Sequence, residues 1–332
     1  MPATDEDILR DLMRRCTDGL HPPASVAPAV AARQRRRHLR HRAFSVAATG
    51  AALGAAAGVA LAAAPRQAGQ PGTGGAPAIR LTAAQRTLYK LSATAARQAP
   101  GPGRYVVMRE IQDNYVKISV IDSVTGDVWT YQHGAGVPAE LPVDRHGSPT
   151  QAEFKALPTS PAALRALLIA QYDQQQKAGQ EAMAAQVAKA VKAAKGALRE
   201  KLRERLRESL RAVPVPLSDD DKVFEQASDM LWNPLVGPRL RSALLKVLAA
   251  TPGVMVSTHA RDDRGRPAVE ISRVESKTGV VLATYEAPAT VTVLEQTDTY
   301  PPSYSGGHTS VGRDLYLSIT RAGAVPPNPY AG

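Results

Sequence analysis

The spacing of hydrophobic residues changes period several times after residue 80, and each change predicts a different element. Residues 81–98 carry Leu88, Leu91 and Ala95 on one side of a helical repeat, and Thr82 is suited to cap that helix. Alternation with a period of two then predicts three short strands, at residues 104–110, 115–120 and 128–132. Turn residues separate these segments, so we expect the strands to pair antiparallel.

Helical spacing returns at residue 160 and continues for a long stretch. Ser160 is suited to cap a helix whose first position is Pro161. A stripe of aliphatic residues between charged ones then extends the predicted helix to residues 161–212. The stripe consists of Val187, Val191, Leu198, Leu202, Leu206 and Leu210. The long charged helix is interpreted either as a solvated helix laid over a sheet or as a helical arm with a coiled-coil surface. Ser218 and Pro238 begin two further predicted helices, at residues 219–232 and 239–250.

The last part of the chain returns to strand periodicity. Five strands are predicted, at residues 254–259, 268–274, 280–285, 290–295 and 315–320. Gly265 and Gly279 mark turns, and residues 326–330 are expected to be loose. A Pro-Gly pair followed by hydrophobic residues opens both strand blocks, at Pro102 and Pro252, which indicates a distant internal similarity. Runs of helices and runs of strands in this order predict an α+β domain with an antiparallel sheet.

Composition limits the chemistry that the chain can perform. The 332 residues are 44% hydrophobic and 21% charged, so a packed core is attainable and the composition argues against wholesale disorder. One cysteine excludes an intramolecular disulfide and any multi-cysteine zinc or iron–sulfur site. The net charge is +11, and its densest cluster of arginines lies just before residue 43.

Residues 43–64 predict a transmembrane helix. These 22 residues contain no charged residue, His, Asn, Gln or Pro. As a helix they would be about 33 Å long, which is enough to cross the roughly 30 Å hydrocarbon core of a bilayer. Arginines flank the N-terminal side densely, and they include Arg35, Arg36, Arg37, Arg40 and Arg42. Because positively charged flanks stay in the cytoplasm, we expect an inner N-terminus and an outer C-terminal domain.

A cleaved signal peptide and a buried core helix are the alternatives for this segment. The basic region before it is long for a signal peptide, and Pro65 follows the best small-residue cleavage site, Ala62-Ala63-Ala64. An uninterrupted apolar stretch beside clustered arginines also argues against a core helix. The sequence therefore favours an uncleaved anchor.

The anchor divides the chain into four parts: a cytoplasmic tail at residues 1–42, the span at 43–64, a flexible linker at 65–80 and the outer domain at 81–332. In the tail, residues 5–16 predict an amphipathic helix that could contact a cytoplasmic regulator or the membrane surface. Gly50, Gly54 and Gly58 share one face of the span, which either forms a homodimer seam or reflects composition alone. The arginine cluster is assigned to topology and anionic lipid, and no nucleic-acid partner is expected.

Signatures of catalysis are missing from the sequence. The seven histidines form no H-E-x-x-H motif, and no G-x-S-x-G, Walker or G-x-G-x-x-G motif occurs in a suitable context. Residues 144–148 (DRHGS) contain the residue types of a catalytic triad, but such adjacency is more typical of a polar loop. Asp262, Asp263 and Gly265 predict a hairpin turn in which Arg266 holds a carboxylate or carbonyl. We therefore predict no catalytic residue, metal or cofactor.

Several short segments resemble an uncharacterised actinobacterial family of single-pass envelope proteins that are often encoded beside extracytoplasmic-function sigma factors. The resemblance is carried by residues 240–270, 157–164 and 224–231, together with Asp5-Glu6-Asp7 and the arginine-rich stop before one span. It implies the same topology and an envelope context, and it implies no reaction. The charged stretch at about residues 174–211 is longer than the family pattern.

These observations predict a non-enzymatic, membrane-anchored envelope protein whose outer domain senses or binds a ligand. A link to sigma-factor signalling through the inner tail is part of this hypothesis. The alternatives are an outer carrier of lipid or another apolar ligand, and a hydrolase without a familiar motif. A pocket that gathers His133, His146 or His259 with a carboxylate and a serine would favour the hydrolase.

Overall fold

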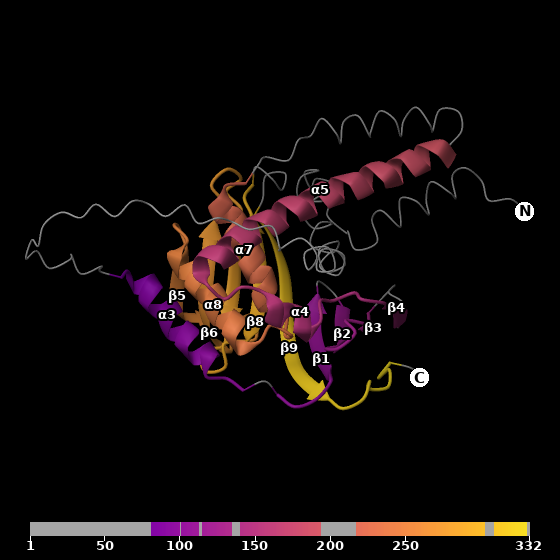
Figure 1. Cartoon of the computed structure of the whole chain (residues 1–332), viewed down its shortest axis with the longest axis horizontal. Helices are drawn as coiled ribbons and strands as arrows, with labels where there is room; N and C mark the ends of the chain where they lie inside the picture. The colour runs from indigo at the N-terminus through magenta and orange to yellow at the C-terminus, as the bar shows by residue number, and fades with distance from the viewer. Residues whose placement is uncertain are drawn as a thin grey trace, which may run out of the picture.

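The computed structural model describes residues 81–99, 101–112, 115–134, 140–193, 217–302 and 309–330. The helices are α3 (Ala83–Ala96), α4 (Gln151–Ala156), α5 (Pro161–Ala193), α7 (Asp219–Trp232) and α8 (Pro238–Ala250). The strands are β1 (Tyr105–Gln112), β2 (Tyr115–Asp122), β3 (Val128–His133), β4 (Glu140–Asp144), β5 (Met255–Arg261), β6 (Pro267–Val274), β7 (Val281–Glu286), β8 (Val293–Tyr300) and β9 (Ser310–Ala322). Figure 1 shows the helices along one side of a large sheet.

The strands form one nine-stranded sheet in the order β4-β3-β2-β1-β9-β8-β7-β6-β5. Every pairing is antiparallel. Strands β1–β4 form one meander and β5–β9 form another, and the pairing of β1 with β9 joins the two. The predicted α+β class with an antiparallel sheet is therefore confirmed.

Capping hydrogen bonds explain where the predicted helices begin. The Thr82 hydroxyl accepts from the Gln85 N–H, and the Gln85 side chain accepts from the Thr82 N–H. Ser218 and Asp221 make the same reciprocal pair at the start of α7. Helix α8 begins at Pro238, where the missing N–H has no intrahelical role.

The core lies between the sheet and the helices α3, α7 and α8. Leu88, Phe224, Leu244, Leu245 and Leu248 are fully buried there, as the helical spacing of their hydrophobic neighbours predicts. Helix α3 packs along α8, where the Ser92 and Ser242 hydroxyls lie 2.8 Å apart. This helical layer leaves the opposite face of the sheet without a helix among the described elements (Figure 1).

Helix α5 packs against the core only near its beginning. Leu164, Leu168 and Tyr172 are buried against the helical layer, and no described side chain is buried after Gln175. Beyond that point the helix extends away from the sheet (Figure 1). Its first part is therefore a packed helix and its second part an arm, while residues 194–212 of the predicted charged helix lie outside the described residues.

Several element boundaries differ from the prediction. Strand β8 begins at Val293 rather than at residue 290, because Val291 has a φ of 47° in the turn after β7. Strand β4 and helix α4 are missed by the sequence pattern. Each spans six residues or fewer, and β4 is an edge strand that contains Pro142, so neither shows a full hydrophobic period.

The expectation that residues 326–330 are loose is wrong. The Tyr131 hydroxyl donates to the Pro326 carbonyl at 3.4 Å, and the Tyr330 ring stacks on His133. Asn328 also donates to Glu140 at 3.3 Å. Proline-rich composition alone did not reveal these contacts, because the partners of the segment, Tyr131, His133 and Glu140, come from β3 and β4.

Predictions for the first 80 residues fall outside the described part of the chain. They comprise the inner tail, the span at residues 43–64, the linker, Arg35, Arg36, Arg37, Arg40 and Arg42, and the seam of Gly50, Gly54 and Gly58. Among the helices that the structure does describe, none is both long and apolar enough to cross a bilayer.

Candidate functional site

A small cavity lies where α3 ends, beside the connection between α7 and α8 and the strands β8 and β9. Its volume is about 150 Å³. Arg241, Gln98 and Thr292 contribute polar groups, and Trp232, Leu235 and Tyr316 contribute apolar surface. We call this the Arg241 cavity. It draws on five separate elements, so its shape depends on the complete fold rather than on one motif.

Arg241 and Arg321 both line the cavity, and Arg241 is the more buried of the two, with only 7% of its surface exposed. Arg321 is partly exposed, and its Nη1 donates to the Gly103 carbonyl at 3.1 Å. Arg241 Nη1 donates to the Leu231 carbonyl at 3.0 Å and to the Val291 carbonyl at 3.1 Å. The Nε and Nη2 atoms of Arg241 donate to none of the described residues. Burial lowers the pKa of Arg241, and nearby Glu286 opposes this change. Because an arginine stays protonated in proteins, the cavity holds a cation with donors to spare.

Two stacked aromatic rings form one wall of the cavity. The ring centroids of Trp232 and Tyr316 lie 3.6 Å apart with an interplanar angle of 15°. The Tyr316 hydroxyl donates to the Trp232 backbone carbonyl at 2.7 Å, which holds the Tyr316 ring in position. Burial raises the pKa of Tyr316 well above its ordinary value, so its hydroxyl remains a neutral donor. This wall is rigid and largely apolar.

Glu286 lies behind the cavity and is fully buried. It pairs with Val293 across β7 and β8, and Val293 lines the cavity. Neither carboxyl oxygen accepts a hydrogen bond from any residue that the structure describes. Burial raises the pKa of Glu286 to about 7, and Arg241 acts in the opposite direction. The charge beside Arg241 therefore changes near neutral pH.

The turn between β7 and β8 carries backbone strain next to this pair. Val291 is β-branched, fully buried and has a φ of 47°, which is unusual for such a residue. The Val291 N–H donates to the Ala287 carbonyl at 2.7 Å, and Arg241 holds the Val291 carbonyl. The Gln98 side chain donates to the Thr290 carbonyl in the same turn. Strain of this kind persists only where the surroundings enforce it, and it concentrates at functional sites.

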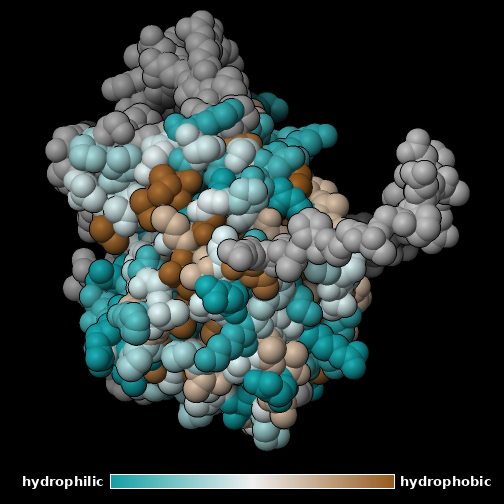
Figure 2. All heavy atoms as spheres, turned by 90° about the vertical axis from the view of Figure 1, so that its left-hand side faces the viewer, coloured by the Kyte–Doolittle hydropathy of each residue, from teal (hydrophilic) through white to brown (hydrophobic). Residues whose placement is uncertain are grey.

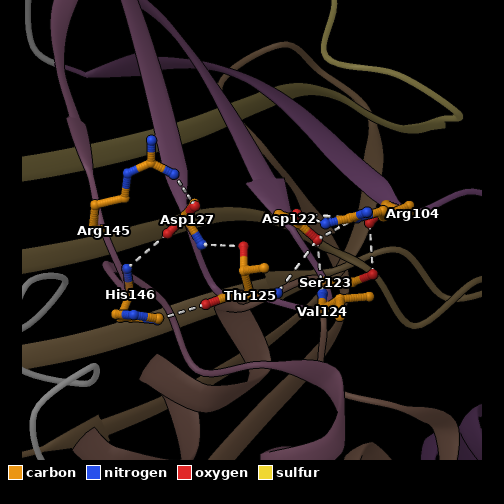
Figure 3. A network of polar contacts seen from close by, with 8 residues as sticks. All are labelled: Arg104, Asp122, Ser123, Val124, Thr125, Asp127, Arg145 and His146. Carbon is orange, nitrogen blue, oxygen red and sulfur yellow. Dashed lines mark hydrogen bonds and ion pairs between the residues drawn. The ribbon is translucent and has the colours of Figure 1, made fainter.

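A second polar cluster lies in the turn between β2 and β3 (Figure 3). Arg104 binds Asp122 through Nε at 2.9 Å and Nη2 at 2.6 Å. Asp127 accepts from the His146 backbone N–H at 3.1 Å and from Arg145 Nη1 at 2.5 Å. The cluster thus joins the predicted turn to the DRHGS loop, which follows it on the other side of β3 and β4.

The acids in this cluster are held ionised by their partners. The hydrogen bond from Arg104 lowers the pKa of Asp122 to about 2, against the effect of burial. For Asp127, burial alone would raise the pKa, but the His146 N–H and Arg145 outweigh it and lower the pKa. Gly126 has a φ of 74°, and a Cβ there would lie 2.1 Å from the Ser148 carbonyl oxygen. These features stabilise the turn between β2 and β3.

The triad residue types of the DRHGS loop do not form a catalytic arrangement. The His146 ring contacts the Thr125 carbonyl at 2.9 Å, while the Ser148 hydroxyl donates to the Pro149 carbonyl. His133 and His259 lie on β3 and β5, which are near opposite edges of the sheet. None of the three histidines lines the Arg241 cavity, so this cavity does not supply the arrangement that would favour the hydrolase.

The turn between β5 and β6 matches its prediction. Gly265 has a φ of 75°, and Arg266 binds Asp262 at 2.5 Å and donates to the Tyr316 carbonyl at 2.7 Å. Arg266 therefore holds both a carboxylate and a carbonyl, and its second contact braces the strand that carries Tyr316. Within the described ranges, no three His, Cys, Asp or Glu side chains are grouped to hold a metal ion.

Sequence reasoning missed the Arg241 cavity, although one signal was present. Arg241 precedes Leu244, Leu245 and Leu248 by three, four and seven residues, so it shares their buried helical face. A cation on an apolar face is uncommon and marks a paired or functional group. Glu286 and Val291 gave no comparable signal, because their importance depends on contacts between β7, β8 and α8.

Comparison with known proteins adds no further information about this site. No protein-family model, curated protein or solved structure matches the chain.

The substitution Glu286→Gln tests the buried carboxyl group. The unfolded chain loses this proton near pH 4.5 and the folded chain near pH 7, so the group's contribution to stability falls between these values. We expect the variant to match the wild type at pH 5 and to be more stable by roughly 1–3 kcal/mol at pH 8. Urea denaturation at both pH values measures this, with the exposed Glu181→Gln as control. A pH-independent difference would contradict the assignment.

The substitution Asp122→Asn tests the turn in Figure 3. The lowered pKa of Asp122 contributes stability above about pH 4, and this is lost as the pH falls toward the folded-state value of about 2. Because Arg104 is half-exposed, solvent screens its interaction with Asp122. We therefore expect the variant to lose roughly 1–2 kcal/mol of unfolding free energy at pH 7, and this difference from the wild type should decrease between pH 4 and 2. Asp263→Asn, which breaks a surface pair with Arg313, is the control and should lose about 0.5 kcal/mol. Equal losses in the two variants would argue against a special role for Asp122.

Proposed function

We propose that this protein is a membrane-anchored envelope protein whose outer domain binds a small organic carboxylate without transforming it. The observation that carries the proposal is the nearly buried Arg241, whose Nε and Nη2 have no partner among the described residues at the cavity. A buried guanidinium with unused donors is most stable when an anion completes its hydrogen bonds.

The cavity defines the chemistry of this ligand. The planar guanidinium presents paired donors that match the two oxygens of a carboxylate. Trp232 and Leu235 can cover an apolar group attached to that carboxylate. A cavity of about 150 Å³ is comparable to one that holds benzene, so the expected ligand has the size of benzoate.

The same groups favour binding over catalysis. The Tyr316 hydroxyl is neutral and already donates to Trp232, and Arg241 has no accessible proton to exchange. Glu286 titrates near neutral pH, but it does not line the cavity. It therefore adjusts the charge around Arg241 and does not reach a ligand atom.

The alternative of an apolar carrier has weaker support. The Arg241 cavity is too small for an acyl chain and contains a cation. Figure 2 shows the side of the molecule that carries α3 and β5, and its described surface is mostly hydrophilic with small apolar groups. Exposed large hydrophobic residues such as Tyr89 and Met255 are consistent with this mixed surface.

In this proposal the inner tail and the outer domain have separate roles. The outer domain takes up the carboxylate, the predicted span holds it at the membrane, and the amphipathic segment at residues 5–16 contacts a cytoplasmic regulator such as a sigma factor. The predicted tail, span and outer domain follow one another along the chain in this order, which supports a regulator contact on one side of the membrane and a ligand site on the other.

Binding of benzoate to the purified chain tests the ligand assignment. We expect a Kd of roughly 10 μM to 1 mM, and a rise in Tm of about 2–4 °C at ten times that concentration. Gly237 lines the cavity, and a Cβ there would meet no atom within 4 Å, so Gly237→Leu should fill the space and abolish binding without unfolding the chain. Gly179→Leu on α5 is the matched control, since its Cβ is equally free. No response of the wild type to benzoate, or an unchanged response in Gly237→Leu, would reject the site.

Thiol labelling in intact cells tests the proposed topology. Cys16, the one cysteine in the sequence, should react with a membrane-impermeant maleimide only after lysis. In a Cys16→Ser background, Lys177→Cys on the exposed side of α5 should react in intact cells. Labelling of Cys16 before lysis, or a mature chain that begins near Pro65, would contradict an uncleaved anchor.

A further inference from the structure

The face of the sheet opposite the helices carries a row of aromatic residues on β3. Val128 packs against the core, so the alternation of a strand places Trp129, Tyr131 and His133 on the other face. Trp129 contacts the ring of Tyr105 on β1, with 6.0 Å between their centroids. Glu140, on the neighbouring edge strand β4, is exposed beside this row. We call Tyr131, His133 and Glu140 the β3 strip.

The chain's own segment 323–330 lies on the β3 strip. The Tyr131 hydroxyl donates to the Pro326 carbonyl at 3.4 Å, and Asn328 Nδ2 donates to Glu140 at 3.3 Å. The ring of Tyr330 stacks on His133 with 5.0 Å between centroids and an angle of 20°. The contacts occur at every second residue, at Pro326, Asn328 and Tyr330, and the segment ends in a turn in which the Tyr330 N–H donates to Asn328 Oδ1 at 2.9 Å.

We propose that the β3 strip is a recognition surface for proline-rich peptides that carry an aromatic residue after the prolines, and that segment 323–330 occupies it in place of a partner protein. The segment reads Pro-Pro-Asn-Pro-Tyr at residues 326–330 and contains no charge. Proline fixes an extended conformation before binding, so little conformational entropy is lost. An aromatic row with a donor to a proline carbonyl is the chemistry by which proteins bind such peptides.

The partial exposure of segment 323–330 indicates that a partner peptide can displace it. Pro327 and Pro329 are exposed, and Pro326, Asn328 and Tyr330 are only partly buried, so the segment rests on the surface. Tyr131, by contrast, is only 5% exposed when the segment is in place. The covalent connection to β9 gives the segment a high effective concentration, which compensates for a weak intrinsic affinity. A partner peptide of the same chemistry competes with this internal occupant.

The experiment uses the full chain and a labelled peptide with the sequence of residues 323–332. In one variant, Asn328→Ala with Tyr330→Ala weakens the internal occupant and leaves the β3 strip intact. By fluorescence anisotropy we expect this variant to bind the peptide with a Kd of roughly 10–500 μM, and the wild type to bind it about tenfold more weakly. Adding Tyr131→Phe removes the hydroxyl donor and should weaken binding by about threefold to tenfold.

Two controls separate recognition from general adhesion or unfolding. A peptide with its prolines replaced by alanine should bind at least about fivefold more weakly, because it loses the extended preference. His259 is an exposed histidine on β5, at the opposite edge of the sheet. Adding His259→Ala to the Asn328→Ala, Tyr330→Ala variant should leave the affinity for the peptide unchanged. The proposal would be overturned if the Asn328→Ala, Tyr330→Ala variant had a native circular dichroism spectrum but did not bind the peptide. Equal affinity of this variant and the wild type for the peptide would also overturn it.

Discussion

The pairing of β1 with β9 is the interaction on which the rest of the fold depends. It aligns Tyr105 with Ala322 and continues to Gln112 and Asp314, with one irregularity between Arg109 and Glu110. Both meanders are complete without it, but they share a sheet only through this contact. Because the two strands are about two hundred residues apart, the loop-closure entropy is large and the helical layer must help to hold them together. The Tyr316 hydroxyl supplies such a link, since it joins β9 to the end of α7 at Trp232.

The Arg241 cavity shows how a polar group is tolerated within this framework. Two backbone carbonyls take the place of water as hydrogen-bond acceptors for Arg241. One of these carbonyls belongs to Val291 in the strained turn. Glu286 reduces the uncompensated charge without a direct hydrogen bond from the described residues. An apolar residue in place of Arg241 would avoid the desolvation of a charge, so stability alone does not account for it. The proposed binding of a carboxylate would account for it.

The reliable predictions from the sequence were those that depend on short-range physics. The caps at Thr82 and Ser218, the start of α8 at Pro238 and the hairpin at Gly265 each require only neighbouring residues, and each is confirmed. The pairing of β1 with β9, the edge strand β4 and the docking of residues 326–330 depend on contacts between distant segments. Of the site, the helical face of Arg241 was visible in the sequence, whereas the partners Val291 and Glu286 were not. The sequence also carries predictions for residues 1–80 that the described structure does not test.

Strand β9 has a consequence for communication within the domain. Tyr316, Ile319 and Arg321 in this strand line the Arg241 cavity, and the chain then continues directly into the segment on the β3 strip. A ligand that orders the end of β9 therefore also restricts where the following residues can lie. Thermodynamic linkage makes such an effect reciprocal, so a partner that removes the segment from its strip would change carboxylate affinity by the same factor. Strand β9 would thus couple the binding of a carboxylate to the binding of a peptide partner.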